Sequence, residues 1–112
     1  MDVVVCLCAC PDVAVAARIA DALVEAELAA CVNIVSGMRS VYRWQGTVER
    51  ADEVLLLIKT VRAQVEPVGA LVASLHPYEL PELLAVEAAA GLPAYLAWVA
   101  DNAIPPPSRS GD

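Results

Sequence analysis

The chain has 112 residues, a length that suits one domain with a modest hydrophobic core. Its hydrophobic fraction of 59% is high, but much of the excess is alanine, and no apolar run approaches the roughly 18 residues of a membrane-spanning helix. The net charge of −7 argues against nucleic-acid binding, because an acidic surface repels phosphate groups.

The start of the chain and its cysteines indicate a reducing compartment. Asp2 stands where a secretory signal peptide carries a positive charge, so we expect a cytoplasmic protein with reduced thiols. None of the four cysteines forms a Cys-x-x-Cys pair, which excludes thioredoxin-like and zinc-finger patterns. Because the sequence also lacks a Gly-rich phosphate loop and holds one histidine, we do not expect an enzyme.

The first half of the chain predicts a strand, a helix and a long hairpin. The run "VVVCLCAC" is apolar at every position and ends at a Pro-Asp turn signal, as a buried strand does. Asp12 is a good N-cap for a helix over residues 13–29, where apolar side chains recur on one face. Residues 31–60 predict one hairpin that turns at Gln45-Gly46.

The second half predicts a helix, a short strand and a last helix. Because Pro67 is tolerated only in a first helical turn, the helix starts at about Val65 and ends near residue 75. A strand over residues 82–87 and a helix over residues 93–100 follow. The tail 104–112 is rich in Pro and Ser and predicts disorder, which leaves one domain over residues 1–103.

The predicted order is β-α-β-β-α-β plus a C-terminal helix, the α+β arrangement called ferredoxin-like. Its two helices cover one face of an antiparallel sheet, so strands open to water on the other face alternate apolar and polar residues. The first strand and residues 54–58 do not alternate. We therefore expect another copy of the chain to cover the second face.

Three cysteines share one face of the first strand. Neighbouring residues on that face stand roughly 6.6 Å apart at Cα, whereas two thiolates on one zinc ion approach to about 3.7 Å. We therefore expect Cys6 and Cys10 to be small core residues. Cys8 lies near the end of the strand, where one thiolate can join ligands from elsewhere, and copper(I) suits it best.

His76 is the only histidine, and it lies in a segment stiffened by Pro77 and Pro81. This rigid segment also carries Tyr78 and Glu79. One interpretation of His76 is structural: it caps the C-terminal end of a helix with its hydrogen bonds satisfied. The other is functional, as a ligand or an acid–base group.

Lys59 and Trp44 are further candidates. Lys59 ends an apolar strand, and a buried lysine requires a partner such as Glu79, Glu82 or a carboxylate of another subunit. Trp44 lies with Tyr42 near the hairpin tip, where aromatic residues indicate either an interface or a local cross-strand pair.

Four stretches together resemble the signature blocks of the CutA divalent-cation tolerance family: "LVEAELAACVNIV", "SVYRWQGTVERADEVLLLIKT", "LHPYELPELLAV" and "GLPAYLAW". The resemblance runs in order from about residue 3 to residue 102. It implies a ferredoxin-like fold, a bacterial cytoplasmic location, and a tight homotrimer similar to the PII signalling proteins. In such a trimer long hairpins pair between subunits and clefts lie between them.

The resemblance also implies a metal site. Metal binding in the family is attributed to a cysteine at the end of the first strand and to histidines before a Pro-Tyr motif. Cys8 and His76 match these positions, while Leu75 stands in place of a second histidine. Our first hypothesis is a homotrimer of metal-ion response that binds copper or another divalent ion weakly through Cys8 and His76.

The second hypothesis is a PII-like sensor or scaffold. A cleft between its subunits then binds a small molecule or a protein partner, with no role for nucleic acid or membrane. The candidate cleft residues are Trp44, Glu53, Lys59, Tyr78 and Glu79.

Overall fold

The computed structural model describes residues 2–105, so the predicted tail lies outside the described residues from residue 106 on. The elements follow the order β1 (Val3–Cys10), α1 (Val13–Glu25), β2 (Cys31–Trp44), β3 (Thr47–Val61), η1 (Arg62–Gln64), α2 (Val65–Leu75), β4 (Leu84–Glu87) and α3 (Pro93–Asn102). No helix in this part of the chain is long and apolar enough to cross a membrane.

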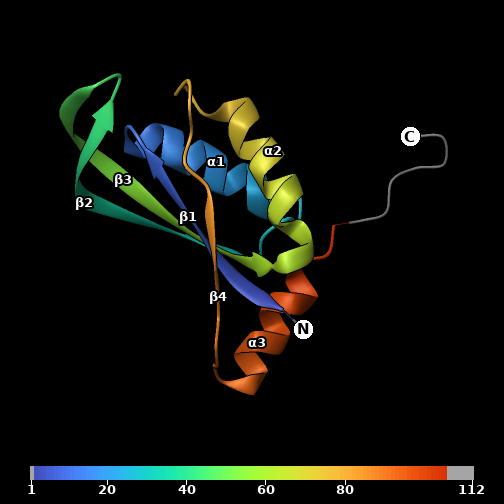
Figure 1. Ribbon diagram of the computed structural model, residues 1–112. Coiled ribbons are helices and arrows are strands. Elements are labelled where there is room, and N and C mark those ends of the chain that lie inside the picture. The colour runs from blue at the N-terminus through green and yellow to red at the C-terminus, as the bar shows by residue number, and fades with distance from the viewer. Residues whose placement is uncertain (1, 106–112) are drawn as a thin grey trace.

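The strands form one antiparallel sheet in the order β2-β3-β1-β4, with α1 and α2 packed on the same face (Figure 1). This is the predicted ferredoxin-like α+β arrangement, which is confirmed. The helix α3 lies at the opposite end of the molecule from the hairpin tip (Figure 1). The projecting hairpin therefore borders one end of the sheet, and α3 borders the other.

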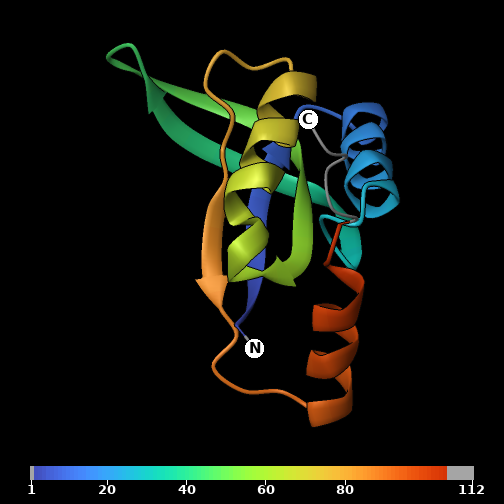
Figure 2. The ribbon, with the colours of Figure 1, turned by 90° about the vertical axis from the view of Figure 1, so that its right-hand side faces the viewer.

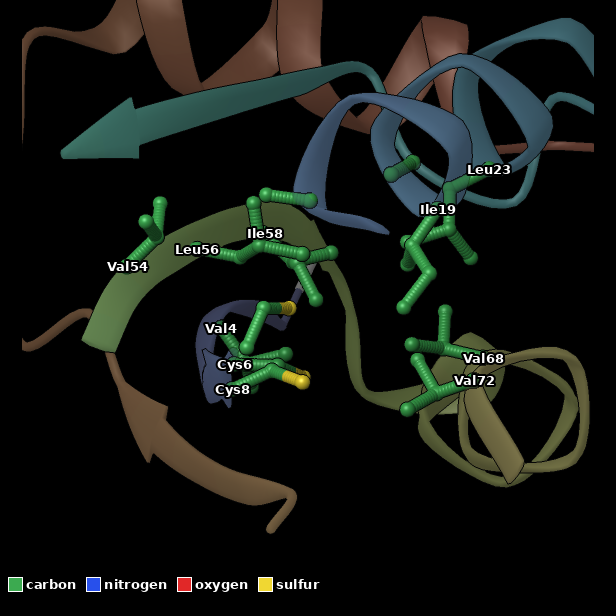
Figure 3. Packing of buried hydrophobic residues seen from close by; sticks show 13 residues of the cluster. Val4, Cys6, Cys8, Ile19, Leu23, Val54, Leu56, Ile58, Val68 and Val72 are labelled. Carbon is green, nitrogen blue, oxygen red and sulfur yellow. The ribbon is translucent and has the colours of Figure 1, made fainter. Parts of the chain in front are cut away.

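The core lies between the sheet and the two helices (Figure 3). Alternate residues of β1, which include all three of its cysteines, point into it, and Cys6 and Cys8 stand opposite Ile58 and Leu56 of β3. From the other side the helices contribute Ile19, Leu23, Val68 and Val72. Each fully buried Leu or Ile contributes about 1.5–3 kcal/mol relative to an exposed position.

The helix α1 ends earlier than the predicted residue 29. Its N-cap is Asp12, as predicted, and the Asp12 carboxylate accepts a hydrogen bond from the Val15 amide at 2.9 Å. At the other end Glu27 has a φ of 58°, and the amides of Leu28 and Ala29 both reach back to the Leu23 carbonyl. This left-handed turn satisfies the last carbonyls and redirects the chain into β2.

The predicted long hairpin is confirmed, with one irregularity. Gln45 and Gly46 both have positive φ, as the tight turn requires. A bulge interrupts the β2–β3 register between Val35 and Met38, and Gly37 with a φ of 86° makes it possible.

The last strand and the last helix differ slightly from their predicted bounds. The strand β4 starts at Leu84 instead of residue 82, because its pairing with β1 begins at the Leu7–Leu84 pair. The preceding residues 76–83 instead run over the end of β1. The helix α3 extends two residues beyond the predicted residue 100.

The sheet face opposite α1 and α2, which we call the open face, is also apolar. Val5 and Leu7 of β1 and Leu55 and Leu57 of β3 are only half-buried there. At its β4 edge Leu84 remains 58% exposed. Two layers within one chain therefore leave a hydrophobic surface without a cover.

The outer half of the hairpin forms an arm that projects from the sheet (Figure 2). Pairing between β1 and β3 begins at the Cys10–Val54 pair, so β3 before that point pairs only with β2. Several large apolar side chains on the arm are exposed, namely Val41, Tyr42, Trp44 and Val48. The arm is thus a second uncovered surface.

Candidate functional site

Two cysteines and the single histidine meet at the C-terminal end of β1. The Sγ atoms of Cys8 and Cys10 and a ring nitrogen of His76 all lie within 4.8 Å of one another. Cys8 and Cys10 are fully buried, and His76 is 8% exposed. The two predicted metal ligands, Cys8 and His76, come from residues far apart in the sequence, and the fold brings them together.

Cys10 is the residue that sequence reasoning missed at this site. We expected the strand spacing to keep the cysteines of β1 apart and Cys10 to act as core packing. Cys10 is indeed buried in the core, but its sulfur approaches that of Cys8 more closely than the roughly 6.6 Å spacing of their Cα atoms. The available signal was that Cys8 and Cys10 share a face at the very end of a strand, where side chains can lean together.

The two thiols influence each other's ionisation. A hydrogen bond between them, followed by burial, raises the pKa of Cys8 above its ordinary value. The same hydrogen bond lowers the pKa of Cys10, although burial and the nearby charge of Glu53 oppose this change. The Glu82 carboxylate acts on both thiols in the same direction as burial. A metal ion at this site must therefore displace thiol protons.

Both ring nitrogens of His76 have protein partners. The Nε2 atom lies 2.7 Å from the Ala9 carbonyl oxygen, and the Tyr78 amide donates to Nδ1 at 3.1 Å. These contacts assign the proton to Nε2 and leave the Nδ1 lone pair as acceptor. The strand β4 pairs with β1 only as far as Leu7. The His76 ring therefore donates a hydrogen bond to the Ala9 carbonyl, which lies beyond the last β1–β4 pair. The structural and the functional interpretation of His76 thus both have support.

A pocket of about 840 Å³ lies on the open face, between the hairpin arm and residues 77–82. Four of the five predicted cleft residues line it: Trp44, Glu53, Tyr78 and Glu79. Further lining comes from Leu7, Ala9, Met38, Ser40, Tyr42, Arg43, Leu55, Pro77, Leu80 and Glu82. Three carboxylates and three aromatic rings therefore border one hollow.

Tyr78 and Glu53 form the main polar contact in this pocket. The Tyr78 hydroxyl donates to Glu53 Oε2 at 2.7 Å, and Glu53 as a residue is only 8% exposed. Burial, followed by the hydrogen bond to Glu53 and its negative charge, raises the pKa of Tyr78 above its ordinary value. The rings of His76 and Tyr78 are also in tilted contact, with 4.6 Å between their centroids, so the thiol–imidazole cluster and the pocket share one segment of chain.

Lys59 lies apart from the other predicted cleft residues. Its Nζ lies 5.9 Å from the ring centroid of Tyr95 on α3, and the Tyr95 ring is in tilted contact with that of Trp98. None of the ion pairs found within residues 2–105 involves Lys59, so Glu79 and Glu82 of the same chain are not its partners. A ring face instead provides its electrostatic contact.

Comparison with known proteins gives a consistent result. Residues 4–102 match the family described as CutA1 divalent ion tolerance protein. The divalent-cation tolerance protein CutA of Thermus thermophilus is 49% identical over 82% of this chain and 89% of its own length. The mouse protein CutA is 46% identical over 80% of this chain, and the match spans 51% of that longer protein.

Solved structures agree with the sequence relatives. The divalent cation tolerance protein of Thermus thermophilus superposes with a TM-score of 0.87 at 48% identity, covering 91% of this chain and 98% of the other. CutA of Xylella fastidiosa superposes with a TM-score of 0.89 at 42% identity, covering 93% of this chain and all of the other. In fold and in sequence, this chain belongs to the CutA1 divalent ion tolerance protein family.

Proposed function

We propose that this protein acts in tolerance of divalent metal ions and binds a metal ion directly through Cys8 and His76. The single observation that carries this proposal is the meeting of a buried thiol and a buried imidazole within 4.8 Å. The names of the bacterial relatives, divalent-cation tolerance proteins, support the biological role. Copper and other late transition metals suit such donors.

The donor set fits a metal ion on one condition. A thiolate and a neutral imidazole are good ligands, but His76 must release one of its two hydrogen bonds before a ring nitrogen can coordinate. This exchange opposes binding, and it is the structural basis for the weak affinity that we propose.

Calorimetry on the reduced, metal-free protein tests the site. Copper(II) and zinc(II) are titrated into the wild type, Cys8→Ser and His76→Ala, with Cys31→Ser as the control because Cys31 is half-buried and outside the cluster. We expect at least about tenfold weaker binding in the first two variants. Unchanged affinities in both variants contradict direct binding at this site.

We propose, further, that the protein assembles as a homotrimer. The open face and the hairpin arm support this, because each exposes large apolar side chains that a single chain leaves uncovered. Light scattering at micromolar concentration is expected to give the mass of three 11.8-kDa chains. A mass near that of one chain contradicts the proposal.

A second candidate function is recognition of a small molecule or a protein partner in the pocket on the open face. The observation in its favour is that four predicted cleft residues line one hollow of about 840 Å³. Trp44 provides an intrinsic fluorophore for screening compound libraries against the wild type and Glu53→Gln. Ligands whose affinity is identical in both proteins do not use this pocket.

We also propose a non-catalytic role in a reducing compartment, the cytoplasm. The proposed metal site requires reduced thiols, and a reducing compartment keeps them in that form. The only histidine is hydrogen-bonded through both ring nitrogens to main-chain groups, and no nucleophilic hydroxyl or carboxylate within residues 2–105 is hydrogen-bonded to it, which supports a non-catalytic role. Cell fractionation with an antibody against the protein tests the location.

A further inference from the structure

The cluster at the end of β1 contains two sulfur donors, where the family resemblance required only one. Cys10 Sγ belongs to the same group of atoms within 4.8 Å as Cys8 Sγ and the His76 ring nitrogen. Cys6, two residues before Cys8 on the same face, is equally buried but lies outside this group. Cys10, and not Cys6, therefore completes the three-donor group with Cys8 and His76.

We propose that Cys10 is the second thiolate of a buried three-donor site that selects a soft, thiophilic ion, with copper(I) as its natural occupant. The proposal rests on the proposed metal-binding function and extends it from divalent ions to a monovalent one. Two sulfurs and one nitrogen form a soft donor set. Hard ions such as magnesium and manganese require oxygen ligands, and within residues 2–105 no carboxylate belongs to the cluster.

The number and spacing of the donors agree with a three-coordinate ion. With metal–donor bonds of about 2.3 Å, three donors around a trigonal ion stand about 4.0 Å apart. The donors here lie within 4.8 Å of one another, so shifts of side-chain torsions suffice to close the site. Structural zinc sites take four protein ligands, and the cluster in the described chain has three.

The surroundings of the cluster favour a low-coordinate, dehydrated ion. Cys8 and Cys10 face Leu56 and Val54 of β3, and both sulfurs lie in the hydrophobic core. Such a site offers little room for the water ligands that divalent ions usually retain. The charges of Glu53 and Glu82 are near enough to act on the thiols, and they add a negative potential that attracts a cation.

The hydrogen bonds of His76 provide an independent readout of binding. Coordination through Nδ1 must displace the Tyr78 amide, which donates to that nitrogen at 3.1 Å. Coordination through Nε2 must displace the Ala9 carbonyl at 2.7 Å. Because Nε2 carries the ring proton, its coordination shifts that proton to Nδ1, which then no longer accepts from the Tyr78 amide. The amide resonance of Tyr78 is therefore expected to shift when copper(I) binds.

The decisive experiment compares single-thiol variants in competition for copper(I). Reduced full-length protein under argon competes with a chromogenic copper(I) chelator, and zinc(II) is measured in parallel with a zinc chelator. We expect copper(I) binding to be at least about tenfold weaker in Cys10→Ser and in Cys8→Ser, as loss of a ligand requires. Cys6→Ser, from the same strand and the same core, is the matched control and should bind like the wild type.

A second variant and a spectroscopic measurement distinguish the loss of a ligand from the misfolding of a variant. Cys10→Ala keeps an apolar side chain in the core and should reproduce the loss seen with Cys10→Ser. X-ray absorption of the copper(I)-loaded wild type needs no variant and should show two sulfur ligands and one nitrogen. Copper bound by a single sulfur overturns the inference.

The outcomes separate this inference from the function on which it rests. If Cys8→Ser and His76→Ala lose copper while both Cys10 variants retain it, the two-thiolate site is wrong and the simpler metal site stands. If zinc(II) binds more tightly than copper(I), the selection of a soft ion is wrong. If no variant changes any affinity, direct metal binding at this end of β1 is wrong as a whole.

Discussion

At the residue scale, the few buried polar side chains each have one identifiable role. Glu53, Thr60 and His76 are the polar residues with the least exposure, and each takes part in a specific hydrogen bond. Within residues 2–105 no buried side-chain nitrogen or oxygen lacks a partner. Because a buried unpaired group costs about 1–3 kcal/mol, each of these contacts can be tested by removing one atom.

Thr60 provides the cleanest test of a structural hydrogen bond. Its hydroxyl donates to the Leu28 carbonyl at 2.7 Å and ties the end of β3 to the turn after α1. Thr60→Val keeps the shape and leaves that carbonyl without its donor, so we expect the free energy of unfolding to fall by about 1–3 kcal/mol. Thr47→Val, at an exposed position of the same strand, is the control. Denaturant unfolding at one fixed protein concentration measures both, and equal effects contradict the assignment.

Tyr78 is expected to ionise unusually late in alkaline titration. Its folded pKa lies above the ordinary value of about 10, because burial and Glu53 disfavour the phenolate. The contact therefore contributes stability below the unfolded pKa, and this contribution is lost as the pH rises through the folded pKa. Ultraviolet absorption should show one of the three tyrosines ionising last. Tyr78→Phe should abolish this phase and Tyr42→Phe should retain it, and the reverse result would rule out Tyr78.

At the element scale, the sequence marks the start of α1 more clearly than its end. The start of α1 follows from Asp12, whose carboxylate caps the Val15 amide. The end of α1 was predicted four residues too late, because alanine-rich sequence continues past Glu25. The buried Leu23 carbonyl, which accepts two amides of the following turn, decides the end instead.

Loss of the α1 cap should reduce the stability of the fold. Asp12→Ala leaves the Val15 amide without its partner, so we expect a loss of about 1 kcal/mol in the free energy of unfolding. Asp12→Asn is the matched control, because an amide oxygen still accepts the hydrogen bond. Thermal and denaturant unfolding followed by circular dichroism measure the difference. If the two variants are destabilised equally, the carboxylate charge and not the cap is responsible.

At the scale of the whole molecule, the chain has one hydrophobic core and two uncovered apolar surfaces, the open face and the hairpin arm. The helices α1 and α2 bury the central strands β1 and β3 on one face of the sheet, whereas the open face keeps a row of apolar residues at intermediate exposure. The sequence already indicated this, because β1 lacks the polar alternation of a strand that borders water. Contact with other copies of the chain covers such a face without any additional element in the fold.

A charge on the open face should separate assembly from folding. Leu84 is 58% exposed in the single chain, so Leu84→Glu should leave the fold of one chain intact. If other copies cover this face, the buried carboxylate should lower the mass in light scattering from that of three chains to that of one. Val13→Glu, at 52% exposure on the helical layer, is the control and should keep the trimer mass. A full trimer mass for Leu84→Glu places the interface elsewhere.

The sequence by itself determined the order and type of the elements, the long hairpin and the apolar second face. These depend on local pattern, namely the unbroken apolar run of β1, the Asp12 cap and the Gln45-Gly46 turn. The family blocks in the sequence also indicated Cys8 and His76 as a pair.

Only the tertiary structure decided what these residues contact. Cys10 lies beside Cys8, Tyr78 donates to Glu53, and the Lys59 Nζ lies over the ring of Tyr95. These contacts depend on how strand ends, loops and α3 pack. Periodicity assigns a side chain to a face of its element. It does not give the few ångströms by which side chains lean toward one another at the end of a strand, and the proposed metal site depends on that distance.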